Sequence, residues 1–377
     1  MNTNIKQKQK RRSPRRRKDK LTVGKVFFRI GVAFLALLIS LITALYILLY
    51  TVAYGPSESV RNLLVLSALQ ASATKWVPGL VLPEQTVQEI WDNSFVVNTE
   101  EIDIEQYVPP VDENGAVIDE WADYPEGIRY ETVNGSTFKA YILLVKDPSR
   151  VFVGPTYDYE SAAYGVRIFD ACEKEGVVAA INAGEYLDTG GGGNGARPMG
   201  LTYSKGTCVW NDGYRKTFMG FDKNDRLIVR EPLTKAEADE LGIRDGVSFQ
   251  TGNILIEKTA DSVKLHYEDG NNGTAQRTAI GQREDGTVIL LVTDGRTASS
   301  LGATHNDVID IMVDYGAVSA GMLDGGSSSM MYYKDYYTKY NIDESTLDQY
   351  QKQGMINKYK AFTTPRRIPT YFMVRGE

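Results

Sequence analysis

The sequence predicts an α+β protein with a mixed, mostly antiparallel β-sheet and flanking helices, preceded by a single N-terminal transmembrane helix. Short apolar runs separated by polar turns follow one another between residues 199 and 293, and these hairpin patterns outnumber strand–helix–strand units. Before them, Ile30 to Tyr54 is a run of 25 residues without a charge, rich in Leu, Ile, Ala and Val. Such a run is long enough to cross a bilayer as a helix.

Charge is divided unevenly along the chain. Residues 1–29 hold twelve of the 42 Lys and Arg residues and one of the 48 Asp and Glu residues, so the remainder has 30 basic and 47 acidic residues, a net charge of −17. A basic tail directly before a spanning helix predicts a cytoplasmic N-terminus and contact with anionic membrane lipid. The acidic remainder lies outside the cell in this prediction, and its charge argues against nucleic acid as a partner.

The uncharged run is interpreted as an anchor that is not cleaved, because a signal peptide has a shorter apolar core and a small-residue cleavage site. The protein is therefore expected in the cell membrane as a single-pass protein with an extracellular body. The predicted organisation is a basic cytoplasmic tail (1–29), a transmembrane helix (30–54), a membrane-proximal helical stalk (55–95), an acidic, turn-rich linker (96–134) and a main domain (135–377).

Helices of the main domain are expected at 159–175, 235–241 and 304–315. The first ends at Gly176, and the third begins with a capping box, Thr304 and Asp307, and ends at Gly316. Strands are expected at 140–145, 177–181, 199–203, 207–210, 218–222, 226–230, 247–250, 254–257, 276–282, 288–293, 318–323 and 370–374. Cys172 and Cys208 can pair in an exported chain, or can both be small buried apolar residues.

The segment LDGGSSS at 323–329 ends an apolar run with one acid, two glycines and three serines. Asp324 is thereby placed at the end of a buried strand, where the scaffold is stiff. Gly325 and Gly326 let backbone N–H groups approach a ligand, and successive N–H groups in such a turn can bind an anion. Ser327 and Ser328 add hydroxyl donors. A tight hairpin turn is the structural alternative.

Three further clusters have a similar design. Asn182 and Glu185 follow a buried strand and precede a glycine-rich loop, which is not a P-loop because no Lys-Ser/Thr follows it. Arg277, in a strand with small neighbours, can present its planar fork to a phosphate or carboxylate, although a structural salt bridge is the alternative. Asp294 and Arg296 follow the next strand, in a sequence that also suits a hairpin turn.

Several chemistries are disfavoured by the composition. The two histidines, His266 and His305, form no HExxH zinc motif, and the cysteines form no nucleophile motif. The remaining carboxylates, arginines, amides and backbone N–H groups suit hydrolysis at an anomeric carbon with an anionic leaving group. No cofactor is required by these residues; a divalent cation near so many acids is possible, but no ligand spacing requires one.

Together, four segments in order resemble the phosphodiester glycosidase family, over roughly residues 135–377. They are INAGEY (181–186) with GARPMG (195–200), RTAIGQREDG (277–286), TDGR (293–296) with SLGAT (300–304), and LDGGSSS (323–329). The basic tail and spanning helix are similar to those of bacterial members often labelled exopolysaccharide biosynthesis proteins. One departure is Asn-Ala-Gly-Glu at 182–185, where many members have Asn-Gly-Gly and an aromatic residue.

The resemblance implies hydrolysis of a sugar-1-phosphodiester, of the N-acetylglucosamine-1-phosphodiester type, on surface polysaccharide or teichoic acid. It places carboxylates at the reacting centre, phosphate-binding arginines, a phosphate-cradling turn, and residues that position sugar or water. The carboxylates are Asp324 and Asp294, and the phosphate-binding arginines are Arg277 and Arg296. The phosphate-cradling turn consists of Gly325, Gly326, Ser327 and Ser328. The residues that position sugar or water are Asn182 and Glu185. Two alternatives stay open: a non-catalytic polysaccharide-binding or assembly protein, and a glycopolymer transferase.

Overall fold

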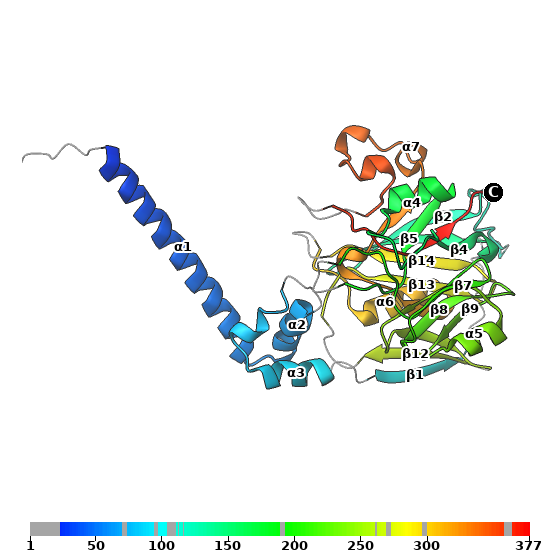
Figure 1. Ribbon diagram of the computed structural model, residues 1–377, viewed down its shortest axis with the longest axis horizontal. Helices are drawn as coiled ribbons and strands as arrows, with labels where there is room; N and C mark the ends of the chain where they lie inside the picture. The colour runs from blue at the N-terminus through cyan, green and yellow to red at the C-terminus, as the bar shows by residue number, and fades with distance from the viewer. Residues whose placement is uncertain are drawn as a thin grey trace, which may run out of the picture. The chain divides into compact units, whose positions relative to one another are not determined.

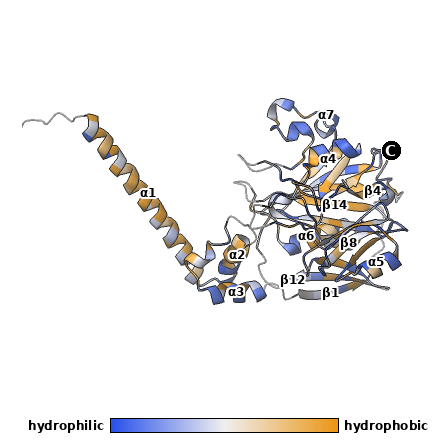
Figure 2. Ribbon diagram, viewed as in Figure 1, coloured by the Kyte–Doolittle hydropathy of each residue, from blue (hydrophilic) through white to orange (hydrophobic). Residues whose placement is uncertain are grey.

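The computed structural model describes residues 23–69, 74–93, 97–103, 111, 113–115, 117–188, 193–260, 262–268, 273–295, 300–357 and 364–377. The chain forms two compact units (Figure 1), Met1–Gly55 and Pro56–Glu377. In the first unit, helix α1 (Val23–Tyr54) carries Lys25 and Arg29 near its beginning and is otherwise mostly apolar (Figure 2). Its 32 residues are long and apolar enough to cross a membrane, which suits an anchor or a signal sequence.

The second unit contains three sheets, in which every strand pair among the described residues is antiparallel. In spatial order, the eight-stranded sheet consists of β1 (Val97–Asp103), β12 (Ser262–Glu268), β11 (Ile254–Lys258), β15 (Ala317–Met322), β13 (Thr278–Arg283), β14 (Val288–Thr293), β3 (Lys139–Val145) and β2 (Ile128–Asn134). The five-stranded sheet consists of β7 (Thr207–Asn211), β6 (Leu201–Ser204), β10 (Ile243–Phe249), β8 (Thr217–Asp222) and β9 (Leu227–Arg230). The four-stranded sheet consists of β16 (Met331–Tyr333), β5 (Ala179–Asn182), β17 (Tyr371–Val374) and β4 (Val151–Gly154).

Helices of the second unit are α2 (Glu58–Leu69), α3 (Glu84–Asn93), α4 (Ile168–Glu175), α5 (Lys235–Leu241), α6 (His305–Asp314) and α7 (Tyr336–Lys339). Short 3₁₀ turns are η1 (Pro78–Leu80), η2 (Pro148–Arg150), η3 (Gly326–Ser328), η4 (Glu344–Thr346) and η5 (Gln351–Gln353). Helices together with antiparallel sheets confirm the predicted α+β class.

The eight-stranded sheet is covered on both faces near its middle, which explains why β13, β14 and β15 are buried at every position. On one face of β13, Thr278 bonds to Asn182 of the four-stranded sheet, and Gln282 bonds to Leu227 of the five-stranded sheet. From the other face, Gly281 lies against Met312 of α6. Because side chains alternate along a strand, even-numbered β13 residues face the two smaller sheets and odd-numbered ones face α6.

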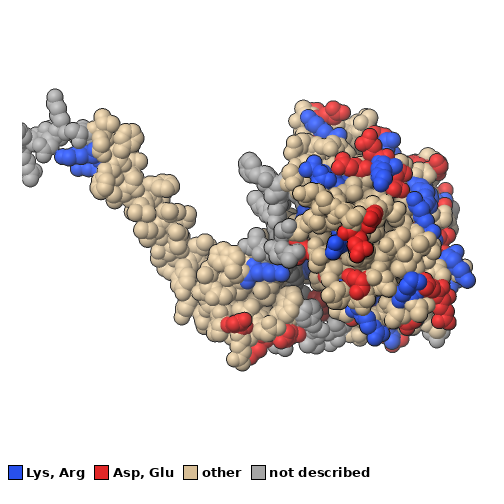
Figure 3. Space-filling view, in the orientation of Figure 1, with Lys and Arg blue, Asp and Glu red and all other residues tan. Residues whose placement is uncertain are grey.

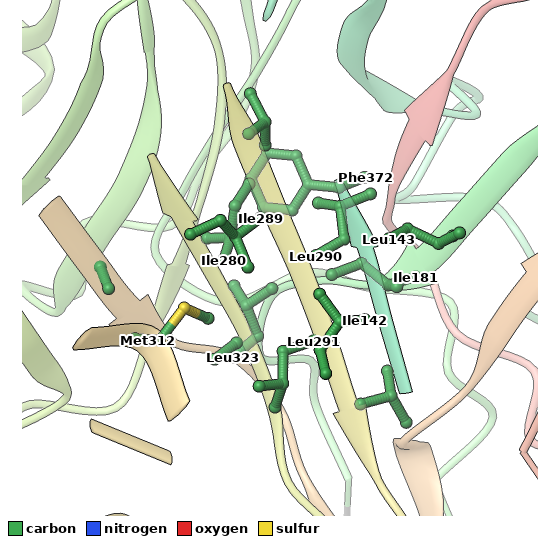
Figure 4. Packing of buried hydrophobic residues seen from close by; sticks show 14 of the residues in the cluster. Ile142, Leu143, Ile181, Ile280, Ile289, Leu290, Leu291, Met312, Leu323 and Phe372 are labelled. Carbon is green, nitrogen blue, oxygen red and sulfur yellow. The ribbon is translucent and has the colours of Figure 1, made fainter. Parts of the chain in front are cut away.

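The main core joins residues of all three sheets and of α6, and part of it lies between the eight-stranded and four-stranded sheets. Figure 4 shows Leu290 of β14 and Leu143 of β3 beside Ile181 of β5 and Phe372 of β17. All four side chains are fully buried. Continuous apolar runs are typical of strands buried on both faces, so the sequence pattern has a direct structural cause.

Two predicted helices are confirmed with their ends. Helix α5 has the predicted bounds, and α6 begins at the predicted capping box, in which the Thr304 side chain and the Asp307 side chain each accept from the other residue's backbone N–H. Helix α4 also ends at Gly176, which adopts a left-handed conformation (φ 66°).

The expected start of the first helix, residue 159, is wrong, because α4 begins at Ile168. The residues before it bond to distant segments instead: Gly165 N–H donates to Asn194 O (2.9 Å) and Val166 pairs with Ile368. A Cβ on Gly165 would lie 2.1 Å from Gly195 O, so this close backbone contact requires a glycine. Tertiary hydrogen bonds thus override the helical spacing of the apolar residues.

The range expected to be an acidic linker, 96–134, contributes β1 and β2 to the two edges of the eight-stranded sheet. Strand β1 pairs with β12 over its full length, and β2 pairs with β3. Edge strands commonly carry charged residues, which prevent pairing with other molecules. The acidic residues of β1 are therefore the reason why the sequence pattern indicated a linker here and not a strand.

The range expected to be a stalk contains α2, η1 and α3. Ser67 of α2 accepts a hydrogen bond from Thr274 N–H (3.0 Å), and a Cβ on Gly273 would lie 2.7 Å from the Leu66 backbone. Leu66 is 3% exposed. Helix α2 thus packs closely against the chain just before β13.

Candidate active site

Asp324 follows the central strand β15 and lies where the eight-stranded and four-stranded sheets meet. Its predecessor, Leu323, is fully buried in the core (Figure 4). The Asp324 N–H donates to Ala183 O (3.1 Å), and the Asn182 Nδ2 donates to Asp324 O (2.6 Å). The ends of β15 and β5 are thereby tied together, so the Asp324 backbone is held from both sheets.

The two positions after Asp324 require glycine for different structural reasons. Gly326 has φ 62°, a left-handed conformation that favours glycine. Gly325 instead lies so close to the neighbouring strand that a Cβ there would be 2.8 Å from Gln276 O. The turn η3 that follows buries Ser328 and leaves Ser327 exposed. The segment is therefore a closely packed turn in which Ser327 is exposed and Ser328 is buried; the phosphate cradle expected from the sequence stays a prediction.

Asn182, predicted to position sugar or water, is fully buried and bonded to the protein. Its Oδ1 accepts from the Thr278 hydroxyl (2.8 Å) and from Met330 N–H (3.0 Å), while its Nδ2 holds Asp324 O. Thr278 also lies 3.1 Å from the hydroxyl of Ser329. In this structure Asn182 fixes both ends of the Asp324 turn.

The carboxyl group of Asp324 has an unusual protonation equilibrium. Burial raises its pKa to about 7, and the negative charge of Glu185 acts in the same direction. A hydrogen bond from Ser328, the positive charge of Arg366 and the Gly325 N–H oppose that rise. At neutral pH the group is thus present in both protonation states, which suits a residue that gives or takes a proton.

Glu185 lies near Asp324 and forms an ion pair with Lys216 at 2.8 Å, with both side chains mostly buried. Its backbone is fixed by Ser248 O, which accepts its N–H (2.9 Å), and by Met199 N–H, which donates to its carbonyl (2.9 Å). The structure therefore brings the two predicted carboxylates Glu185 and Asp324 into one site.

Arg366 also belongs to this site, although the sequence analysis missed it. Its guanidinium donates to Asp188 Oδ2 (2.9 Å) and Ser327 Oγ (3.3 Å) and lies over the ring of Tyr186 at 5.4 Å. The Tyr186 hydroxyl is 3.2 Å from Ser328 Oγ. Only the adjacent pair Arg366-Arg367 before the last strand marks this position in the sequence, and that signal is weak.

Asp294 lies at the same edge of the eight-stranded sheet, two strands away from Asp324. Strands β14 and β15 both run antiparallel to β13, so their last residues meet at one edge. Two strand spacings correspond to roughly 10 Å between backbones. The Asp294 Oδ2 accepts from the Tyr141 hydroxyl (2.6 Å), and burial together with Asp294 raises the pKa of Tyr141.

Arg277 lies directly before β13, between these two acids, but it faces α6. Its Nε donates to Ala303 O (3.1 Å) and its Nη2 to Gly273 O (3.1 Å). Nearby, burial lowers the pKa of His305 to about 3, with the charge of Arg277 adding to this shift, so His305 is neutral at pH 7. Its hydrogen bonds to the two backbone carbonyls give Arg277 a structural role. The phosphate contact expected from the sequence stays a prediction.

Arg296 lies outside the described residues. Cys172 and Cys208 are both free thiols. Within the described ranges, no group of three or more His, Cys, Asp and Glu side chains is placed to hold a metal ion.

Comparisons with known proteins identify a family for this chain. A family model described as phosphodiester glycosidase matches residues 175–375. The SPbeta prophage-derived uncharacterized protein YomE of Bacillus subtilis (strain 168) is 25% identical over 193 residues, which is 47% of this chain and 27% of that protein. This chain thus matches only about a quarter of the length of that relative.

Two solved structures are similar over most of this chain. The zebrafish N-acetylglucosamine-1-phosphodiester alpha-N-acetylglucosaminidase catalytic domain, auto-inhibited by its pro-peptide, has 16% identity and a TM-score of 0.49, covering 74% of this chain and 88% of that one. A hypothetical protein from Synechocystis has 14% identity and a TM-score of 0.45, covering 74% and 68%. Since the family model spans more than half of the sequence and includes Glu185, Asp294 and Asp324, this chain belongs to the phosphodiester glycosidase family.

Proposed function

We propose that this protein is a membrane-anchored, extracytoplasmic hydrolase that cleaves a sugar-1-phosphodiester on cell-surface polysaccharide or teichoic acid. The expected sugar linkage is of the N-acetylglucosamine-1-phosphodiester type. The observation that carries the proposal is Asp324, a carboxyl group whose pKa of about 7 lies near physiological pH. Family membership supports the reaction class, and the apolar helix α1 supports membrane association.

In the proposed reaction, the bond between the anomeric carbon and the phosphate oxygen breaks, and water supplies a hydroxyl group to the sugar and a proton to the products. Asp324 would exchange a proton with the attacking water or the leaving group. Glu185 lies close enough to Asp324 to influence its pKa and would order the water. Asp294, at the same sheet edge, would stabilise positive charge that develops on the sugar.

Phosphate recognition in this proposal falls to Arg366 and Ser327. The guanidinium fork of arginine matches the geometry of phosphate oxygens, and Arg366 already donates to the exposed Ser327 hydroxyl. Arg366 forms an ion pair with Asp188, and its positive charge favours the ionised form of Asp324. A phosphodiester bound beside Ser327 would thus lie next to the carboxyl group that titrates near neutrality.

The test is product analysis with the purified protein and the methyl ester of N-acetylglucosamine-1-phosphate. We expect free sugar and methyl phosphate in equal amounts. Asp324→Asn should reduce kcat by on the order of a hundredfold or more, the usual scale for acid–base catalysis. Asp285→Asn is the matched control, because Asp285 accepts the Thr287 N–H in the exposed turn at the opposite end of the β13–β14 hairpin, away from the site.

Transfer of the sugar phosphate to an added polymer, without free sugar, would instead identify a transferase. Saturable binding of the ester without any product would identify a polysaccharide-binding protein. An Asp324→Asn protein as active as the Asp285→Asn control would remove Asp324 from the chemistry.

A further inference from the structure

Gln276 carries a buried side-chain amide that the protein itself does not satisfy. The residue is 9% exposed, and across the described part of the chain no group forms a hydrogen bond with its Oε1. Buried side-chain acceptors are bonded in the large majority of cases, because losing a bond to water without replacement is unfavourable. An open acceptor at the edge of a candidate site therefore indicates a ligand that supplies the donor.

The position of Gln276 links the two acid-bearing turns. Its backbone carbonyl accepts from Gly326 N–H (2.8 Å), and a Cβ on Gly295 would lie 2.8 Å from its backbone nitrogen. The register of β13 and β14 pairs Thr278 with Val292, and the Thr293 N–H donates to Arg277 O just beyond β13. Continued by one more residue on each side, this register places Gln276 opposite Asp294. Directly opposed residues have Cα atoms about 5 Å apart.

Alternation along β13 also determines which way Gln276 faces. Thr278 bonds to Asn182, which holds Asp324, so this face of β13 is turned toward the acid-bearing site. Gln276 is two residues earlier and shares that face, whereas Arg277 between them is turned toward α6. Gln276 therefore shares the face of Asp294, on the side of the sheet where Asn182 holds the Asp324 backbone.

We infer that Gln276 is a substrate-binding residue that accepts a hydrogen bond from the sugar whose anomeric bond is broken, from a ring hydroxyl or an acetamido N–H. This inference rests on the proposed function. A neutral carboxamide oxygen has no attraction for a phosphate group, which presents only acceptors to it, but it suits the neutral donors of a sugar. The division of labour is thus Arg366 for the phosphate and Gln276 for the sugar.

A second glutamine on the same face of β13 shows the structural alternative and provides a matched control. Gln282 is 6% exposed, and its amide is fully bonded: Oε1 accepts from Leu227 N–H (2.7 Å), and Nε2 donates to Asp225 O (2.8 Å) and Gly286 O (3.1 Å). A glutamine that serves the fold has partners of this kind, and Gln276 has none among the described residues.

The experiment compares Gln276→Leu with Gln282→Leu in the full-length chain purified in detergent. Three properties are measured: the melting temperature, the Kd of N-acetylglucosamine-1-phosphate by calorimetry, and kcat and KM for its methyl ester. For Gln276→Leu we expect an unchanged or higher melting temperature, a Kd weakened roughly tenfold or more, and a loss in kcat/KM that comes mainly from KM. For Gln282→Leu we expect a lower melting temperature with unchanged Kd.

Glucose-1-phosphate methyl ester separates the two possible donors: a loss confined to the N-acetylglucosamine ester identifies the acetamido group, and an equal loss on both identifies a hydroxyl. If the wild-type protein binds the sugar phosphate but hydrolyses neither ester, the proposed function fails, while a weaker Kd for Gln276→Leu still supports the inference. Unchanged Kd and KM in Gln276→Leu, or no binding by the wild-type protein, would overturn it.

Discussion

At the scale of single residues, Asp324 is a carboxyl group placed where its charge is disfavoured. Burial raises its pKa from an ordinary value of 3.8 to about 7. The folded protein therefore holds a proton at this group between about pH 4 and pH 7, whereas the unfolded chain releases it. By linkage, the free energy of unfolding that this group contributes is highest below pH 4 and is lost as the pH rises through 7.

Asp324→Asn removes that titration, so its effect on stability should depend on pH. The difference in unfolding free energy between variant and wild type should grow in favour of the variant from pH 4.5 to pH 8, by roughly 2–4 kcal/mol. Melting curves of both proteins at the two pH values measure it. Parallel pH dependences for the two proteins would show that Asp324 titrates at an ordinary pKa.

The two arginines of the site region should respond differently to replacement by lysine, which keeps the charge but loses the planar fork. Arg366→Lys should lower kcat/KM by roughly tenfold or more with little change in melting temperature, since its fork reaches the accessible Ser327. Arg277→Lys should chiefly lower the melting temperature, because its guanidinium donates to Ala303 O and Gly273 O. Reversed effects would assign phosphate binding to Arg277, as the sequence analysis predicts.

At the scale of elements, the edges of the eight-stranded sheet decide where the folded body begins. Without β1 and β2, strands β12 and β3 would present unpaired backbone groups, and β3 is buried at nearly every position. Ile128, at the start of β2, is itself 1% exposed. Exposed apolar sheet edges pair with other molecules.

Truncation tests this boundary directly. A chain that starts at residue 97 keeps both edge strands and should be monomeric in size-exclusion chromatography. A chain that starts at residue 135, the boundary expected from the sequence, should aggregate. Monomeric behaviour of the shorter chain would show that β1 and β2 are dispensable covers rather than parts of the sheet.

At the scale of the whole molecule, charge and apolar surface are segregated. Acidic and basic side chains intermingle on the face of the body shown in Figure 3, whereas α1 carries Lys25 and Arg29 near its beginning and no charge from residue 30 to its end. A cluster of basic residues on one flank of a spanning helix keeps that flank in the cytoplasm.

The topology prediction follows from that asymmetry. Protease added to intact cells should degrade residues 56–377 and spare an epitope fused at the N-terminus, detected by immunoblotting. Permeabilised cells provide the control, in which both parts should be degraded. Protection of the body in intact cells, or its release into the medium without α1, would contradict an anchored extracellular domain.

The sequence by itself determined the features that depend on local pattern: the apolar helix, the α+β class, the capping box of α6 and the glycine turn that follows Asp324. Periodicity, caps and turn residues act over a few positions, so they can be read without knowing the fold. It also named Glu185 and Asp324, which the structure brings together.

Only the tertiary structure decided which residues meet. The register of β13 turned Arg277 toward α6 and Gln276 toward the acids, although the two are neighbours in the chain. Contacts between residues more than a hundred positions apart brought Arg366 to Asp188. The pairing of Val166 with Ile368 is also of this kind, and the helix expected at 159–175 begins only at Ile168. A shift of one residue in a strand exchanges its two faces, and a hydrogen bond between distant segments leaves no periodic trace, so neither could be predicted from local pattern.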